Sequence, residues 1–221
     1  MTADGLEAVV FDFDGTIFDS ETPIYRASAA ALAEMGLDLT IEGWATAVGL
    51  GEDDSFEALC AAVGTRFDRR EFETRYGAQD RSWRDRLPAL PGIDDLVRDL
   101  HGAEVALGVA SSSSSDWVER HLARLGLRDR FTAIGTRDKV GGRSKPDPAS
   151  YRWAVEALGA DPSRTVAIED SAPGIAAAQA AGLAVVAIPS AITSHTDLSA
   201  ADRTVGAALE IDRELLASLL A

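Results

Sequence analysis

The sequence AVVFDFDGT, residues 8–16, indicates the fold class, because an apolar run here ends in two aspartates that are two residues apart. The run 8–13 has the length and composition of a buried strand, and Asp14-Gly15 has those of a turn. Alternate side chains of a strand point to the same side, so Asp12 and Asp14 share a face. We expect both carboxylates at the carboxyl end of the strand, where open α/β sheets bind ligands.

Further apolar runs repeat the pattern of the first, with helical stretches between them. Continuous apolar composition indicates strands that are covered on both faces, and the intervening helices indicate parallel pairing. We therefore predict an α/β fold, a doubly wound parallel sheet with a Rossmann-like core of about five strands. The other predicted strands are 105–110, 165–168, 184–188 and, with a weaker pattern, 131–134.

Residues 17–91 contain no convincing strand and are too long for a simple crossover connection. We predict that they form an all-helical cap domain, inserted into a catalytic core of residues 1–16 and 92–221. Its linkers to the core, 16–22 and 87–91, would let the cap domain move as a lid. The helix signals are a stop at Gly36, N-caps at Thr40 and Asp53, and a long helix from Asp68 to Arg86.

Composition and charge exclude several classes of protein. Hydrophobic residues make up 46% of the 221 residues and charged residues 26%, which excludes a disordered or fibrous chain. The net charge of −15 makes nucleic acid and anionic membranes poor partners. A small phosphorylated anion can still bind where dipoles, a lysine and a metal ion lie together.

Cys60 is the only cysteine, so no internal disulfide can form, and we interpret it as a buried apolar residue. No segment reaches the ~18 consecutive apolar residues of a membrane helix. We expect a cytoplasmic monomer whose three histidines, His101, His121 and His195, lie on the surface.

Polar residues also follow the other predicted strands. Ser111 follows the run 105–110, Lys145 precedes a predicted helix, and Glu169 and Asp170 follow the run 165–168. Singly, each has an ordinary explanation, such as a flexible serine-rich loop or a solvated lysine. Together they would meet at one edge of the sheet. Carboxylates held this close repel unless a cation lies between them or one is protonated, which indicates a metal site or an acid/base pair.

These motifs resemble those of the haloacid dehalogenase-like superfamily, in the family's order and over residues 8–190, with the helical cap of the phosphoglucomutase-like subgroup. The resemblance implies that the first strand is central. It implies that Asp12 is the nucleophile that receives a phosphoryl group, that Asp14 is the general acid and base, and that Mg²⁺ is the cofactor. The implied metal ligands are Asp12, the backbone carbonyl of Asp14, Glu169 and Asp170; Ser111 and Lys145 would stabilise the transferring oxygens.

The resemblance favours a Mg²⁺-dependent phosphatase that hydrolyses a small phosphorylated metabolite through an aspartyl-phosphate. The alternatives are a sugar phosphomutase of the beta-phosphoglucomutase type and a catalytically silent binding module. Asp14 argues against a dehalogenase, and the absence of any lysine before Lys139 argues against phosphonate cleavage through a Schiff base. Glu52 and Ile24 argue against a mutase, because related mutases have a basic residue and a histidine at these positions.

We expect four residues to contact the substrate: Gly15, Thr16, Ser112 and Glu52. With Asp53 and Asp54, Glu52 would present an acidic edge that repels a second phosphate group.

Overall fold

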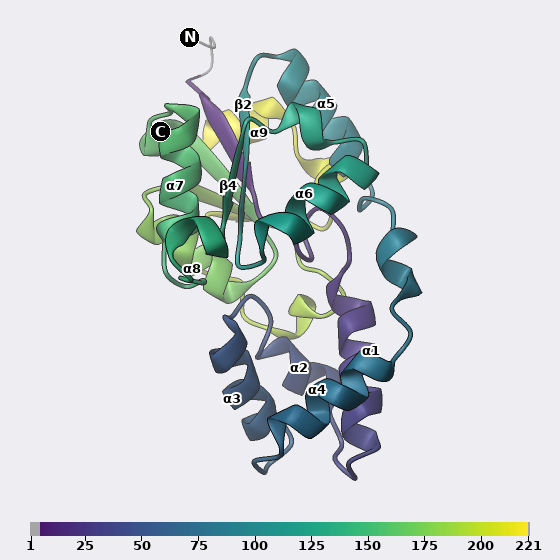
Figure 1. The fold of residues 1–221 in the computed structure, drawn as a ribbon. Coiled ribbons are helices and arrows are strands. Elements are labelled where there is room, and N and C mark those ends of the chain that lie inside the picture. Colours follow the sequence, from purple (N-terminus) through teal and green to yellow (C-terminus); the bar gives the residue numbers. More distant parts are fainter. Residues whose placement is uncertain (1–4, 221) are drawn as a thin grey trace.

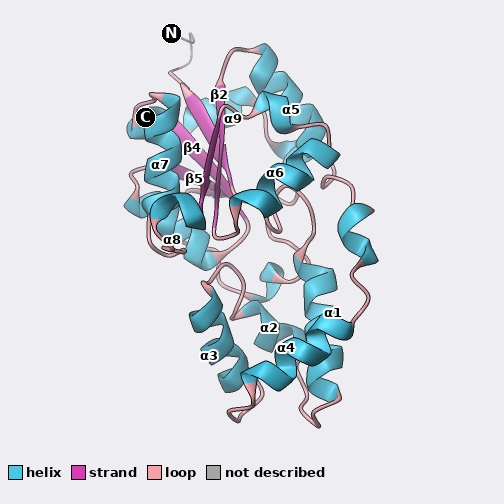
Figure 2. Cartoon of the chain, viewed as in Figure 1, coloured by secondary structure: helices cyan, strands magenta, loops and turns pink. Residues whose placement is uncertain are grey.

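The centre of the molecule is a parallel sheet with the strand order β3-β2-β1-β4-β5-β6, in a computed structural model that describes residues 5–220 (Figures 1 and 2). The doubly wound topology with a central β1 is as predicted. The strands are β1 (Ala8–Phe11), β2 (Ala106–Ser111), β3 (Ala133–Thr136), β4 (Thr165–Glu169), β5 (Ala184–Ala187) and β6 (Arg203–Thr204). The predicted number of about five omitted β6, which has only two residues, both of them exposed.

The register of the sheet brings the strand ends together. Phe11 pairs with Val109 of β2 on one side and with Ile168 of β4 on the other. Asp12 therefore leaves β1 at the level at which Glu169 ends β4. This alignment places the predicted site residues at the carboxyl edge of three neighbouring strands.

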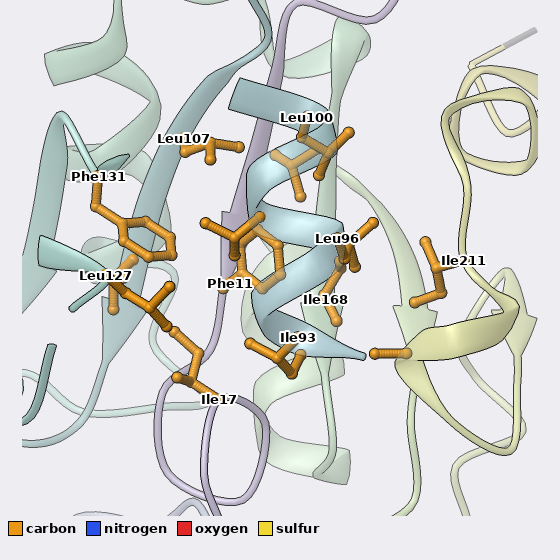
Figure 3. Packing of buried hydrophobic residues seen from close by; sticks show 14 of the residues in the cluster. Phe11, Ile17, Ile93, Leu96, Leu100, Leu107, Leu127, Phe131, Ile168 and Ile211 are labelled. Atoms are coloured by element: carbon orange, nitrogen blue, oxygen red, sulfur yellow. The ribbon is translucent and has the colours of Figure 1, made fainter. Parts of the chain in front are cut away.

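Helices cover both faces of the sheet, which explains why β1 is apolar throughout rather than alternating. On one face, Phe11 and Leu107 lie beneath the helix α5 (Ile93–Gly102), whose Ile93, Leu96 and Leu100 recur with helical spacing (Figure 3). Burying each of these side chains contributes about 1.5–3 kcal/mol. On the other face, Val10 belongs to a second apolar cluster with Tyr151.

The helices α5 and α6 lie on one side of the sheet, and α7 and α8 lie on the other (Figure 1). Besides α5, the described α-helices outside residues 17–91 are α6 (Ser115–Arg124), α7 (Ala149–Leu158), α8 (Ala172–Ala180) and α9 (Arg213–Ser218). Short 3₁₀ helices are η2 (Arg128–Arg130), η3 (Arg137–Val140), η4 (Pro162–Arg164), η5 (Thr193–His195) and η6 (Ala208–Glu210). None of the helices within residues 5–220 is long and apolar enough to cross a membrane.

Four helices lie together at the carboxyl end of the sheet, below it in Figure 1. They are α1 (Glu21–Ala33), α2 (Ile41–Ala45), α3 (Glu52–Ala62) and α4 (Arg69–Ala78). They pack around an apolar cluster that includes Leu32, Trp44 and Leu59, close to the buried Cys60. Ile192, which follows β5, is the one buried member of this cluster from outside residues 17–91 among the described residues. A cluster formed mainly by these helices supports our proposal that residues 17–91 are a cap domain.

The helix starts agree with the predictions at Thr40 and Asp68, whose side chains accept hydrogen bonds from Gly43 N and Glu71 N. The predicted N-cap at Asp53 is wrong. The helix α3 begins two residues earlier, with Gly51 as the N-cap residue, where a Cβ atom would come within 3.1 Å of Ser144.

The predicted long helix to Arg86 is also wrong. The helix α4 ends at Ala78, because Gln79 takes an extended backbone conformation. The chain continues through a separate 3₁₀ helix, η1 (Ser82–Asp85).

Candidate active site

A cavity of about 640 Å³ lies between the carboxyl edge of the sheet and the helices α1–α4. Of the predicted site residues, Asp12, Asp14, Ser111, Ser112, Lys145, Asp170 and Glu52 line this cavity. Gly15, Thr16 and Glu169 do not belong to its lining. Gly15 is instead required by the backbone: its φ of +91° favours glycine, and a Cβ atom there would overlap the carboxylate of Asp170.

Asp12 and Glu169 are joined by the ammonium group of Lys145, and all three side chains are buried. Lys145 Nζ donates to Asp12 Oδ1 and, at 2.5 Å, to Glu169 Oε1. Burial raises the pKa of Asp12 to about 7, against the opposing charge of Lys145. Burial acts to lower the pKa of Lys145, but the two carboxylates together hold it above its ordinary value. Lys145 is therefore charged and fixes one oxygen of Asp12.

Glu169 already accepts hydrogen bonds at both of its oxygens. Besides Lys145, Oε1 accepts from the Tyr151 hydroxyl at 2.7 Å. Oε2 accepts from the backbone N–H groups of Asp170 and Ser171 and from the Ser171 hydroxyl. Glu169 thus holds Lys145 in place. The sequence analysis missed Tyr151, because it lies among the apolar positions of α7 and nothing local marks its hydroxyl.

The acidic cluster has the chemistry of a cation site. Ligand oxygens of Asp12, Glu169 and Asp170 all lie within 4.8 Å of one another, and all three residues are buried. Among the described residues, Asp12 Oδ2 and Asp170 Oδ1 have no hydrogen-bond partner. Burial and the neighbouring Asp12 raise the pKa of Asp170 well above its ordinary value. A hard divalent cation would satisfy both oxygens and offset the excess negative charge.

Asp14 accepts three hydrogen bonds through its carboxylate. Ser20 Oγ and Trp117 Nε1 donate to Oδ1 at 2.7 and 2.9 Å, and Ser113 Oγ donates to Oδ2 at 2.6 Å. The donors come from the linker before α1, from the loop after β2 and from α6. The sequence analysis did not identify any of the three, because nothing local connects them to Asp14.

The serine run 111–115 connects the end of β2 to the start of α6, and each of its hydroxyl groups has a hydrogen-bond partner. Ser111 Oγ accepts from Ser113 N, and Ser112 Oγ accepts from Lys145 N. Ser113 donates to Asp14, Ser114 is the N-cap of α6, and Ser115 pairs with Thr136. The loop therefore places Lys145 and Asp14 relative to each other.

The cap side of the cavity carries a buried acid, Glu21, the first residue of α1. Its side chain accepts from Trp44 Nε1 at 3.2 Å. Burial, and then the charge of Asp14, raises the pKa of Glu21 to about 8. The sequence analysis missed Glu21, because a glutamate at a helix start is ordinarily solvent-exposed.

The predicted acidic edge has positive partners in the structure. Glu52 pairs with Arg137 of η3 at 2.9 Å, and Asp53 pairs with Arg69 at 2.7 Å. The exclusion of a second phosphate by Glu52 stays a prediction. Because Arg137 offsets the negative charge of Glu52, the repulsion depends on whether this ion pair persists when the substrate binds.

The histidines do not line the cavity. His101 and His195 are exposed, as predicted. The prediction is wrong for His121, which is fully buried beside the rings of Phe18 and Trp117. Burial lowers its pKa, so the ring packs as a neutral group.

Comparison with known proteins finds relatives over most of the chain. A family model described as haloacid dehalogenase-like hydrolase matches residues 9–188. The protein YhcW of Bacillus subtilis (strain 168) is 31% identical over 96% of each chain. Hexitol phosphatase B of Escherichia coli (strain K12) is 32% identical over 82% of this chain and 83% of its own. The solved structure of CbbY from Rhodobacter sphaeroides in complex with phosphate is 29% identical, covers 93% of this chain and 96% of its own, and has a TM-score of 0.72.

Proposed function

We propose that this chain, a phosphatase that belongs to the haloacid dehalogenase-like hydrolase family, hydrolyses small phosphorylated sugars with Mg²⁺ as cofactor and Asp12 as nucleophile. The substrate class is inferred from the similarity to hexitol phosphatase B. The observation that carries the proposal is the arrangement of Asp12. Lys145 fixes one of its carboxylate oxygens, the other has no partner within residues 5–220, and Asp12 lines the same cavity as Asp14.

The reaction has two steps. In the first, a carboxylate oxygen of Asp12 attacks phosphorus, the ester P–O bond breaks, and Asp14 gives a proton to the leaving oxygen. In the second, Asp14 takes a proton from water, the resulting hydroxide attacks phosphorus, and inorganic phosphate leaves Asp12. Lys145 and the loop that begins at Ser111 would stabilise charge on the transferring oxygens.

Asp12 and Asp170, with the backbone carbonyl of Asp14, would hold Mg²⁺. When bound, the ion would reduce the repulsion between the Asp12 carboxylate and the phosphate dianion. Glu169 belongs to the same acidic cluster, but its oxygens already accept hydrogen bonds. We therefore propose that Glu169 acts mainly by holding Lys145.

The cavity suits a sugar phosphate in both size and lining. Its volume lies within the range that is usual for small-molecule sites, about 300–1,000 Å³. The core side is polar, whereas the cap side combines apolar and charged groups that suit the carbon faces and hydroxyl groups of a sugar. The cap-side residues include Ile24, Leu50, Phe56, Phe72, Ser55 and Arg69.

The test is a turnover screen over hexose, hexitol and pentose monophosphates, a sugar bisphosphate and p-nitrophenyl phosphate, with and without Mg²⁺. We expect phosphate release that requires Mg²⁺, and an acid-stable, base-labile phosphoenzyme after quenching. Asp12→Asn should abolish both while leaving the unfolding transition in place. The matched control, Asp99→Asn on the exposed side of α5, should behave as the wild type.

Each alternative gives a different result in the same screen. A mutase would convert a hexose 1-phosphate to the 6-phosphate without net release, and a binding module would release no phosphate from any substrate. Near wild-type phosphate release by Asp12→Asn would overturn the nucleophile assignment.

A further inference from the structure

The three donors to Asp14 differ in how firmly they are held. Ser20 and Ser113 donate through hydroxyl groups, whose O–H bond can turn while the rest of the side chain stays in place. Trp117 donates through an indole N–H that lies in the plane of a rigid ring. The backbone of Trp117 is also fixed, because its N–H donates to the N-cap residue Ser114 in the first turn of α6. Trp117 is therefore the stiff member of the group.

The ring of Trp117 is held by contacts with the first linker of the cap domain and with the 3₁₀ helix η1, which precedes the second linker. On the first linker, Phe18 lies 6.2 Å away between ring centroids. In η1, Trp83 lies 6.4 Å away in an edge-to-face arrangement, and the Arg84 guanidinium lies 5.3 Å from the Trp117 ring. His121, buried in α6, packs against the same ring at 4.1 Å. A shift of the first linker or of η1 would therefore move the indole.

We infer that Trp117 is a positioning residue for the reaction: its indole N–H sets the orientation of the Asp14 carboxylate and makes that orientation depend on the first linker of the cap domain and on η1. The inference rests on the proposed role of Asp14. A carboxyl group transfers a proton only when it lies within hydrogen-bond reach of the leaving oxygen. Without the indole donor, Oδ1 keeps only the rotatable hydroxyl of Ser20 among the described residues.

The test compares substrates whose leaving groups do and do not need a proton. In Trp117→Phe, we expect the single-turnover rate with the fastest sugar phosphate of the screen to fall about 10- to 100-fold, with KM changed less than about twofold. The burst of p-nitrophenol from p-nitrophenyl phosphate should stay within about twofold of wild type, because this leaving group departs without a proton. A ring without an N–H at Trp117, introduced as β-(3-benzothienyl)alanine, keeps the shape and should give the same pattern.

The matched control is Trp153→Phe. Trp153 lies in α7, on the opposite side of the sheet from α6, so removing its indole should leave both rates unchanged. A second readout does not depend on turnover. In ¹H–¹⁵N spectra, Asp14→Asn should shift the indole resonance of Trp117 and leave that of Trp153 in place.

The outcomes separate this inference from the proposed function. If Asp14→Asn leaves the sugar phosphate rate unchanged, the proposed role of Asp14 fails. If Asp14→Asn slows that rate but both Trp117 substitutions do not, or if they slow both substrates equally, the positioning role of Trp117 is wrong.

Discussion

Glu21 makes the stability of this protein depend on pH in an unusual direction. Its carboxyl group is buried at the start of α1 and is hydrogen-bonded to Trp44. Burial, and then the charge of Asp14, raises its pKa from 4.5 to about 8. The folded protein therefore retains a proton that the unfolded chain loses near pH 4.5. Because the native state binds more protons in this window, the free energy of unfolding falls as the pH rises from about 4.5 to about 8.

The size of the effect follows from the pKa values. Each unit of pKa difference corresponds to about 1.36 kcal/mol, so the loss over the whole window is about 5 kcal/mol. Glu21→Gln stays neutral at every pH, and its side-chain oxygen can still accept from Trp44. We expect the variant to match the wild type near pH 4.5 and to be about 5 kcal/mol more stable at pH 9.

The measurement is urea unfolding followed by circular dichroism between pH 4.5 and 9, in EDTA so that no bound cation alters the acidic site. Glu156→Gln, at an exposed position of α7, is the control for removing one charge from a chain of net charge −15. The free energy of unfolding of Glu156→Gln should change with pH by the same amount as that of the wild type. A difference between Glu21→Gln and wild type that is the same at both ends of the pH range would refute the reasoning.

Two further predictions concern Glu169 and the entrance to the cavity. In Gly174→Ala, the new Cβ would overlap the Glu169 carboxylate, so we expect a loss of about 1–3 kcal/mol in urea unfolding, whereas Gly77→Ala, in open space on α4, should be slightly stabilising. Glu52→Arg should raise kcat/KM for a sugar bisphosphate relative to a monophosphate about tenfold, because it replaces a charge that opposes a second phosphate. The control, Asp54→Arg, makes the same change of charge at a residue that does not line the cavity. An equal rise in relative kcat/KM for Asp54→Arg, or no rise for Glu52→Arg, would contradict the exclusion of a second phosphate by Glu52.

Single residues within the site differ in how far local sequence could reveal them. Asp12, Asp14, Lys145 and Asp170 could be predicted because each lies at the end of an apolar run or before a helix start, and parallel strands end at one edge. The covering of both sheet faces likewise follows from continuous apolar runs. These inferences work because burial repeats with the period of the strand or helix, and a period is visible along the chain.

Local periodicity carries no signal for contacts between distant segments. Trp117 reaches Asp14 across 103 residues, and Lys145 reaches Asp12 across 133. The position of Lys145 before a helix start placed it near the sheet edge, but its role came from the motif that it shares with a family, and Trp117 lies in no such motif.

Local patterns along the chain were therefore enough to predict the succession of the main strands and helices, the helical character of residues 17–91 and the acidic pair at the end of the first strand. The tertiary structure alone decided that Glu21 and His121 are buried, that Tyr151 and Lys145 occupy one oxygen of Glu169, and that Arg137 faces Glu52. The physical reason is that burial of a polar side chain and its partners depends on how whole elements pack against one another. A polar residue within a helix has the same local pattern whether its outer neighbour is water or another helix.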